Sequence, residues 1–136
     1  MNNKGFTLVE LIATIALLSI IAIISFVSIS GILQKSKIND CNDLLISIKT
    51  ASKEYISDNR YNSDFDLDGD KKVNITGRTL VEGNYLSTSI TNPFDDNIDI
   101  TDNVMIEVTL NNDFTANMVI IKNNSGNVVS CDNEEW

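Results

Sequence analysis

The feature that most constrains this chain is a long apolar segment near its N-terminus. From Leu11 to Gln34 the sequence runs for 24 positions without a charged residue, and Ile, Leu and Ala dominate it. As a helix it would extend roughly 36 Å at about 1.5 Å per residue, which is enough to cross the hydrocarbon core of a bilayer. The segment is too long for a typical secretory signal, and no small-residue cleavage site follows it. It therefore predicts a retained membrane-spanning helix.

The rest of the chain is acidic. From Lys35 to Trp136 there are nine Lys and Arg against eighteen Asp and Glu, and the 136-residue chain carries a net charge of −9 with no histidine. Binding nucleic acid requires a basic face, so no direct nucleic-acid partner is expected. The lack of histidine removes Ser-His-Asp and Cys-His catalysis and most catalytic zinc sites, so no enzyme is predicted. Lys4 before the span and acids after it favour a cytoplasmic N-terminus and a translocated C-terminal part.

A carboxylate, Glu10, stands at the edge of the apolar segment. An unpaired carboxylate costs several kcal/mol in such a place, so a positively charged partner is expected. An amino terminus newly exposed at Phe6 of a staggered neighbouring copy would lie about one helical turn away. Glu10 is therefore predicted to guide assembly.

The run KGFTLVEL at residues 4–11, followed by the apolar segment, resembles the class III signal of type IV prepilins and pseudopilins. The resemblance implies that a prepilin peptidase cleaves between Gly5 and Phe6 and methylates the new amino terminus of Phe6. It also implies that Glu10 pairs with the amino terminus of a neighbour during assembly. Many type IV pilins have a proline partway along this helix, whereas the single proline here is Pro93, which leaves open whether the helix is continuous.

The resemblance implies an α+β pilin fold, in which the chain is expected to consist of a leader (1–5), a transmembrane and assembly helix (6–34) and a soluble head (35–136). Apolar residues at three- and four-residue spacing predict that the helix continues through 35–58 and packs on the head. That stripe consists of Ile38, Cys41, Leu44, Leu45, Ile48, Ala51, Ser52 and Tyr55.

A small antiparallel sheet is predicted over 104–131. Val104, Ile106, Val108 and Leu110 alternate with more polar residues, as in a half-buried strand. A second strand is expected over 114–122 and a third over 127–131, after a hairpin turn. Residues 79–86 are expected to form a short helix or turn, and the segment from Leu80 to Asp96 resembles a connection in pseudopilin and Gram-positive pilin heads.

An acidic loop is predicted over 63–77, where carboxylates occur at every second position. Such spacing suits calcium, as in EF-hand loops. One register starts at Asp64 and one, similar to a dockerin loop, at Asp66, and neither supplies the closing bidentate acid. The shared ligands would be Asp66, Asp68 and Asp70, with Asn74 and the Lys72 carbonyl as further ligands. A solvated acidic turn is the alternative.

The only two cysteines are Cys41 and Cys131, one on the predicted helix and one at the end of the sheet. An even count in a translocated domain suggests a disulfide, with two free buried thiols as the alternative. No C-x-x-C spacing indicates a redox or metal site.

These features predict a structural pilin subunit, held in the cytoplasmic membrane before it enters an extracellular pilus. Its expected partners are other copies and related pilins, the prepilin peptidase and an inner-membrane assembly platform. One alternative is a pseudopilin of a type II secretion or DNA-uptake system. Another is a membrane-anchored, calcium-dependent adhesin.

Overall fold

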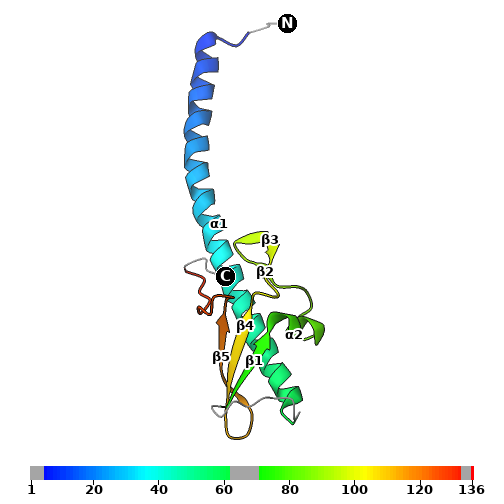
Figure 1. The fold of residues 1–136 in the computed structure, drawn as a ribbon. Helices are drawn as coiled ribbons and strands as arrows, with labels where there is room; N and C mark the ends of the chain where they lie inside the picture. The colour runs from blue at the N-terminus through cyan, green and yellow to red at the C-terminus, as the bar shows by residue number, and fades with distance from the viewer. Residues whose placement is uncertain (1–4, 62–70, 133–135) are drawn as a thin grey trace. The chain divides into compact units, whose positions relative to one another are not determined.

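A computed structural model describes residues 5–61, 71–132 and 136 (Figure 1). The chain separates into two compact units, Met1–Ser36 and Lys37–Trp136. The elements in chain order are α1 (Leu8–Asn59), β1 (Lys72–Thr76), α2 (Gly77–Glu82), β2 (Thr91–Asn92), β3 (Asp95–Asp99), β4 (Met105–Leu110) and β5 (Ala116–Lys122). This is an α+β, pilin-like fold with a long N-terminal helix and small antiparallel sheets, as predicted.

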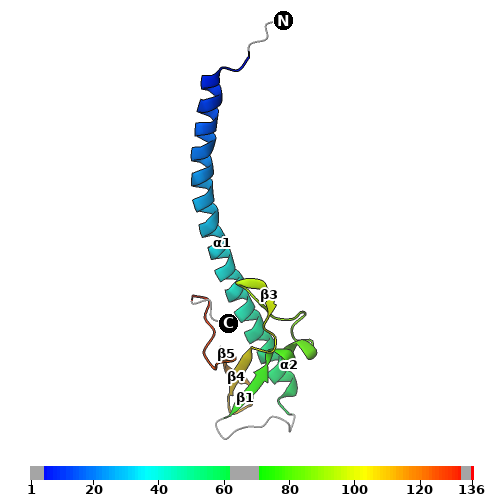
Figure 2. The ribbon, with the colours of Figure 1, turned by 45° about the horizontal axis from the view of Figure 1, so that its top comes forward.

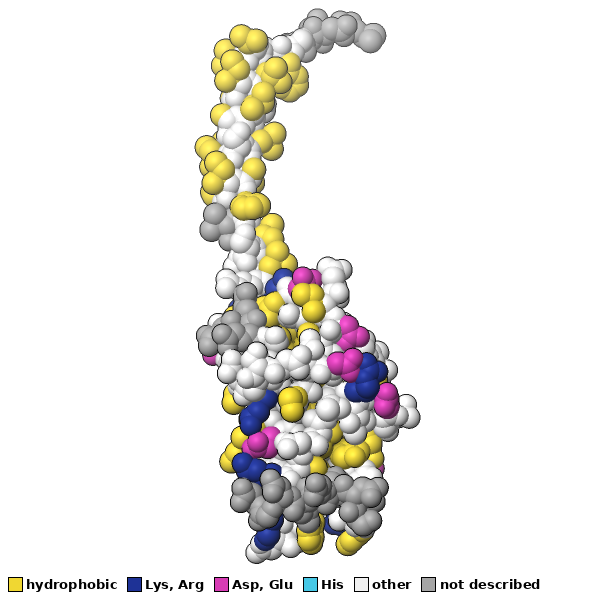
Figure 3. All heavy atoms as spheres, in the orientation of Figure 1, with side chains coloured by type: hydrophobic (Ala, Val, Ile, Leu, Met, Phe, Trp, Pro, Cys, Tyr) yellow, Lys and Arg dark blue, Asp and Glu magenta, His cyan; other side chains and the backbone are white. Residues whose placement is uncertain are grey.

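The first unit is the apolar part of α1, which is long and apolar enough to cross a membrane. Figure 3 shows hydrophobic side chains along the visible face of this part, and the large ones there are exposed. The helix is continuous through Gly31, so the lack of a mid-helix proline coincides with an unbroken helix. Four hydroxyls bond to backbone carbonyls three or four residues earlier: Thr14 to Leu11 (2.8 Å), Ser19 to Ile15 (2.8 Å), Ser25 to Ile21 (2.8 Å) and Ser30 to Phe26 (3.1 Å).

In the second unit, the C-terminal part of α1 packs on one face of a three-stranded antiparallel sheet of order β1-β4-β5 (Figures 1 and 2). The predicted helix stripe faces this core, because its members are buried or half-buried, and Ile56 extends it. The alternation predicted for β4 is confirmed: Val104, Ile106, Val108 and Leu110 are all buried. Branched side chains on the pleated sheet thus meet the apolar stripe of the helix.

The first strand of the sheet, β1, occupies residues that were predicted to belong to the acidic loop 63–77. In β1, Val73 and Ile75 are buried and Asn74 is exposed, so KVNIT alternates as a half-buried strand should. It pairs with β4, with Val73 opposite Val108 and Ile75 opposite Ile106. The prediction of loop conformation up to residue 77 was therefore wrong.

The other end of the sheet also differs from the prediction. β5 begins at Ala116, because Phe114 lies in the β4–β5 turn with φ +61° and donates its N–H to the Asn111 carbonyl (3.1 Å). Residues 127–131 do not form a full third strand. They contribute an isolated bridge between Lys122 and Val128, next to a bond from Val129 N to the Ile121 carbonyl (2.9 Å).

A second, two-stranded sheet, β2–β3, was not predicted. All five residues of β3 are exposed, so the strand has no apolar alternation to reveal it. The hairpin is joined to α1 by Lys37 Nζ, which donates to the Phe94 carbonyl (2.8 Å). Near its base, Thr101 Oγ1 accepts from Ile90 N (2.8 Å), which satisfies a buried donor.

The short helix α2 accounts for the segment expected to be a helix or turn. Thr76 is its N-cap and accepts from Thr79 N (3.2 Å). Gly77 follows it in a space where a Cβ would lie 2.6 Å from the Thr101 carbonyl oxygen and 2.8 Å from Ile90 Cδ1. Only glycine fits there without displacing neighbours.

Candidate functional site

The predicted cleavage bond lies just before the first turn of α1. Gly5 and Phe6 are outside the helix, both are exposed, and a Cβ on Gly5 would meet no atom within 4 Å. The Phe6 side chain is 83% exposed. A bond in exposed, non-helical backbone is accessible to a peptidase, so the geometry suits cleavage between these two residues.

Glu10 is engaged by its own helix terminus. Thr7 N and Thr7 Oγ1 donate to Glu10 Oε2 at 3.0 and 2.8 Å, and Glu10 N donates to Thr7 Oγ1 at 3.3 Å. These reciprocal bonds form a capping box, which satisfies backbone donors that the first turn leaves free. The partner predicted for Glu10 was on another copy only, and Thr7 was missed, although the T-x-x-E spacing at the start of an apolar run is the signature of this motif.

The central residues of the predicted calcium site, Asp64, Asp66, Asp68 and Asp70, lie outside the described residues. Lys72 and Asn74 are described, and both belong to β1. No group of three or more His, Cys, Asp and Glu side chains able to hold a metal occurs in the described parts of the chain.

The Lys72 side chain forms part of an ion-pair row across the sheet. Lys72 Nζ lies 3.2 Å from Glu107 Oε1, and Lys122 Nζ lies 2.8 Å from Glu107 Oε2. The hydrogen bond from Lys122 lowers the pKa of Glu107 most, and that from Lys72 adds to it. One carboxylate thereby joins the two edge strands to β4.

The two cysteines form the predicted disulfide. Cys41 on α1 and Cys131 beyond β5 are bonded, with their Cα atoms 5.8 Å apart and a sequence separation of 90. Both side chains are buried. The bond joins the start of the head's helix to the end of the chain, so the alternative of two free thiols is excluded.

The comparisons with known proteins concern the N-terminal segment. Residues 1–26 match the family described as the prokaryotic N-terminal methylation motif. No curated protein and no solved structure matches the chain. The matched residues contain the exposed Gly5–Phe6 bond and the Thr7–Glu10 capping box, and they run into the apolar part of α1. The chain is therefore a type IV pilin-like prepilin, carrying the class III signal that the pilin and pseudopilin family shares.

Proposed function

We propose that this protein is a structural subunit of a type IV pilus. The observation that carries the proposal is the methylation motif joined to an apolar helix whose large side chains are exposed in the single chain. Exposed apolar area of that extent must be covered by lipid or by other subunits. A prepilin meets both conditions in turn, first in the membrane and then in the filament.

The local geometry supports the order of events. Cleavage after Gly5 creates a positively charged amino terminus at Phe6, next to Thr7. On docking, the amino terminus of a neighbouring copy pairs with Glu10 and displaces the neutral Thr7 donors. The Thr7 donors are neutral, whereas the amino terminus carries a full positive charge, so the new pair adds a Coulomb attraction to the Glu10 carboxylate and the exchange favours assembly. N-methylation leaves the amine positively charged.

A second candidate is a pseudopilin of a secretion or DNA-uptake system, which shares the same signal. The segment from Leu80 to Asp96 is compatible with it, because this segment resembles a connection found in the heads of pseudopilins and of Gram-positive pilins alike. In the structure this segment contains the end of α2, the turn after it and β2. A pseudopilin would be processed identically but would remain in the cell envelope.

The first experiment is mass spectrometry of the amino terminus in material sheared from the cell surface. An abundant chain that begins with N-methylated Phe6 is expected. Processed protein found only in envelope fractions would favour the pseudopilin. Intact Met1 in surface material would contradict both.

Two variants test the steps separately. Gly5→Val should leave the leader attached, because the peptidase requires a small residue before the cleaved bond. Glu10→Ala should be cleaved normally but enter filaments poorly beside wild-type copies, whereas Glu54→Ala, which removes an exposed acid further along α1, should assemble normally. Normal filament yield from Glu10→Ala would remove this residue from the mechanism.

A further inference from the structure

The exposed charges on the C-terminal part of α1 are sorted by sign around the helix axis. An α-helix turns by about 100° per residue, so the direction of each residue around the axis follows from its number. Counted from Lys49, the three exposed lysines of this face lie within about 40° of one another, and the acids lie about 120–180° further round. The basic edge consists of Lys35, Lys49 and Lys53, the acidic edge consists of Asp40, Asp43, Glu54 and Asp58, and all of these residues are exposed.

The two edges border the side of α1 that faces away from the head core. The buried stripe of the helix, which includes Ile48 and Ser52, occupies the remaining arc at about 200–340°. Ile46 lies between the two edges and is 61% exposed. Lys37 lies outside both edges and donates to the Phe94 carbonyl (2.8 Å). An exposed apolar residue between charged borders has the anatomy of a protein–protein contact, which has an apolar centre and a polar rim.

The charges of the two edges do not stabilise their own helix. Lys49 and Lys53 are four residues apart, as are Glu54 and Asp58, and like charges at this spacing repel each other on a helix. In the described part of the chain, no ion pair includes a member of either edge. Asp58 accepts a hydrogen bond from the neutral Tyr85 hydroxyl (3.2 Å). The opposite charge for each edge is therefore not supplied by the described residues of the same chain.

The spacing between the edges follows one rule. Each lysine of the basic edge has an acid five positions later, and the pairs are Lys35 with Asp40, Lys49 with Glu54 and Lys53 with Asp58. Every other offset between a lysine of one edge and an acid of the other occurs only once. Residues five apart on one helix point about 140° away from each other, so they do not meet within it. On two parallel helices staggered by five residues, about 7.5 Å, all three pairs come level together.

This complementarity selects a second copy of the chain as the partner. A copy carries both edges at the matching offset, so one stagger satisfies the basic edge of one helix and the acidic edge of the next. The stagger also agrees with the docking step proposed above, in which the amino terminus at Phe6 of one copy meets Glu10 of another, four positions along the chain. The difference of one residue is about 1.5 Å, which the long, flexible lysine side chains can span.

We propose that the basic edge of α1 in one copy docks against the acidic edge of α1 in a second copy, with the two helices parallel and five residues out of register. The contact joins two different patches of one sequence, so it is heterologous, and a heterologous contact that does not close into a ring produces an open filament. The inference rests on the proposed pilus function and names the register between neighbouring heads. The charge pairs determine register more than affinity, so losing one acid, as in Glu54→Ala, has little effect on assembly.

Zero-length cross-linking tests the register in the unmodified chain. A carbodiimide joins a lysine amine to a carboxylate only where the two are in contact. Cross-linked dimers from sheared surface filaments should contain peptides that join Lys49 to Glu54 and Lys53 to Asp58. Membranes that contain the uncleaved Gly5→Val chain provide the control and should give no such dimers. Dimers linked at another offset, such as Lys49 to Asp43, or no dimers from filaments, would overturn the register.

Reversal of each edge provides the second arm. An acid variant, Lys49→Glu with Lys53→Glu, and a base variant, Glu54→Lys with Asp58→Lys, should each lower filament yield roughly tenfold, because like charges would then face each other. Made together in one cell, the two variants should restore the yield and occur in the same filaments in similar amounts, because each supplies the edge that the other lacks. The control Asp96→Lys with Asp132→Lys changes the charge as the base variant does, at exposed sites away from α1, and should assemble normally.

The outcomes separate the contact from the pilus function. Normal yield from both reversed variants alone would refute the contact and leave the pilus function standing. The same conclusion follows if the two variants together give no more filament than either alone, although both melt near the wild-type temperature and carry methylated Phe6. If the wild type forms no surface filament, the pilus function is refuted. Dimers from its membranes then decide the contact: links at an offset of five support it, and their absence overturns it.

Discussion

Removing the disulfide should strongly destabilise the head. The bond between Cys41 and Cys131 closes a loop of 90 positions. For a loop of that length the chain-entropy relation gives about 4.6 kcal/mol of stability at 25 °C, because the cross-link restricts the unfolded chain. In a unit of about 100 residues, each kcal/mol moves the melting temperature by roughly 4–8 °C, so a fall of roughly 20 °C is expected.

The assay is thermal melting of the full-length chain in detergent, followed by tryptophan emission. Trp136 is the only tryptophan and packs partly buried against the core, so its emission reports loss of the folded head. Cys41→Ala, Cys131→Ala and the double variant should melt at nearly the same temperature, because each breaks the same bond. Reductant should lower the melting temperature of the wild type only. A fall below about 5 °C, or a double variant that loses twice as much as either single one, would refute the reasoning.

Three further predictions concern packing, pH and metal. Gly77→Ala should lower the free energy of unfolding by about 1–3 kcal/mol, measured by denaturant titration, because the added Cβ meets the Thr101 carbonyl. Glu107→Gln should lower the free energy of unfolding of the head at pH 7. The difference in this free energy between the variant and the wild type should shrink as the pH falls below the ordinary carboxyl pKa of 4.5 and through the lowered pKa of Glu107. A difference that does not change with pH would contradict this. Calcium at roughly 10⁻⁴–10⁻³ M should raise the melting temperature of the wild type but not of Asp68→Ala. If the wild type shows no shift, the acidic segment is a solvated turn.

The long helix, the strand β4 and the disulfide could be predicted because each has a strong and regular signal. The helix has an uninterrupted apolar run followed by a stripe, and β4 alternates over six residues. The chain has no histidine and no C-x-x-C spacing, so a metal site or a catalytic role for the two cysteines had no support and a disulfide was favoured. In each case a single physical requirement, burial or a covalent partner, determines the pattern.

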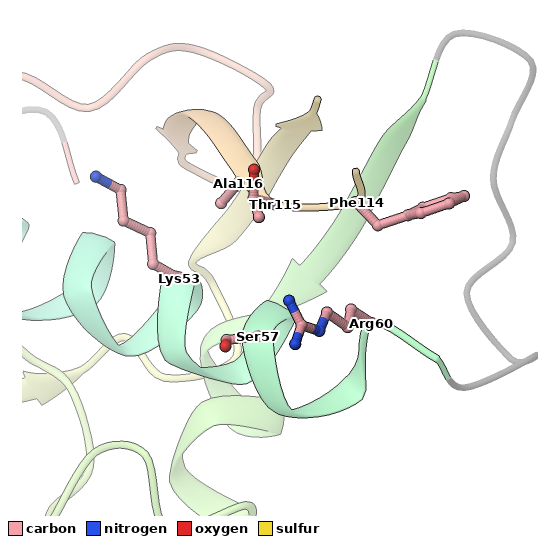
Figure 4. Close-up of a pocket in the computed structure, with 6 residues that line it drawn as sticks. All are labelled: Lys53, Ser57, Arg60, Phe114, Thr115 and Ala116. Atoms are coloured by element: carbon pink, nitrogen blue, oxygen red, sulfur yellow. The ribbon is translucent and has the colours of Figure 1, made fainter. Parts of the chain in front are cut away.

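The parts that were missed have signals that are weak or that point two ways. β1 alternates over only five residues, and the carboxylates that precede it drew Lys72 and Asn74 into a loop assignment. β3 is exposed throughout, so tertiary pairing and not hydrophobic pattern determines it. Phe114 reads as a strand residue by propensity, but turn geometry places it at positive φ. A small pocket (Figure 4) lies between Lys53, Ser57 and Arg60 of α1 and residues 114–116, more than fifty positions later, and only the fold brings these two segments together.

The hydroxyl groups in the apolar part of α1 have a consequence for how the subunit changes environment. The hydroxyls of Thr14, Ser19, Ser25 and Ser30 all donate to carbonyls of their own helix. None of these bonds depends on lipid, water or a neighbouring subunit, so under the proposed function none has to be broken or replaced when the helix passes from the bilayer into a filament. In the proposed pilus subunit, the equilibrium between membrane and filament then depends on the packing of apolar side chains and on the pairing of Glu10 with the amino terminus of a neighbour. In the proposed function, this segment can therefore be covered either by lipid or by the helices of neighbouring subunits without a change in its own hydrogen bonds.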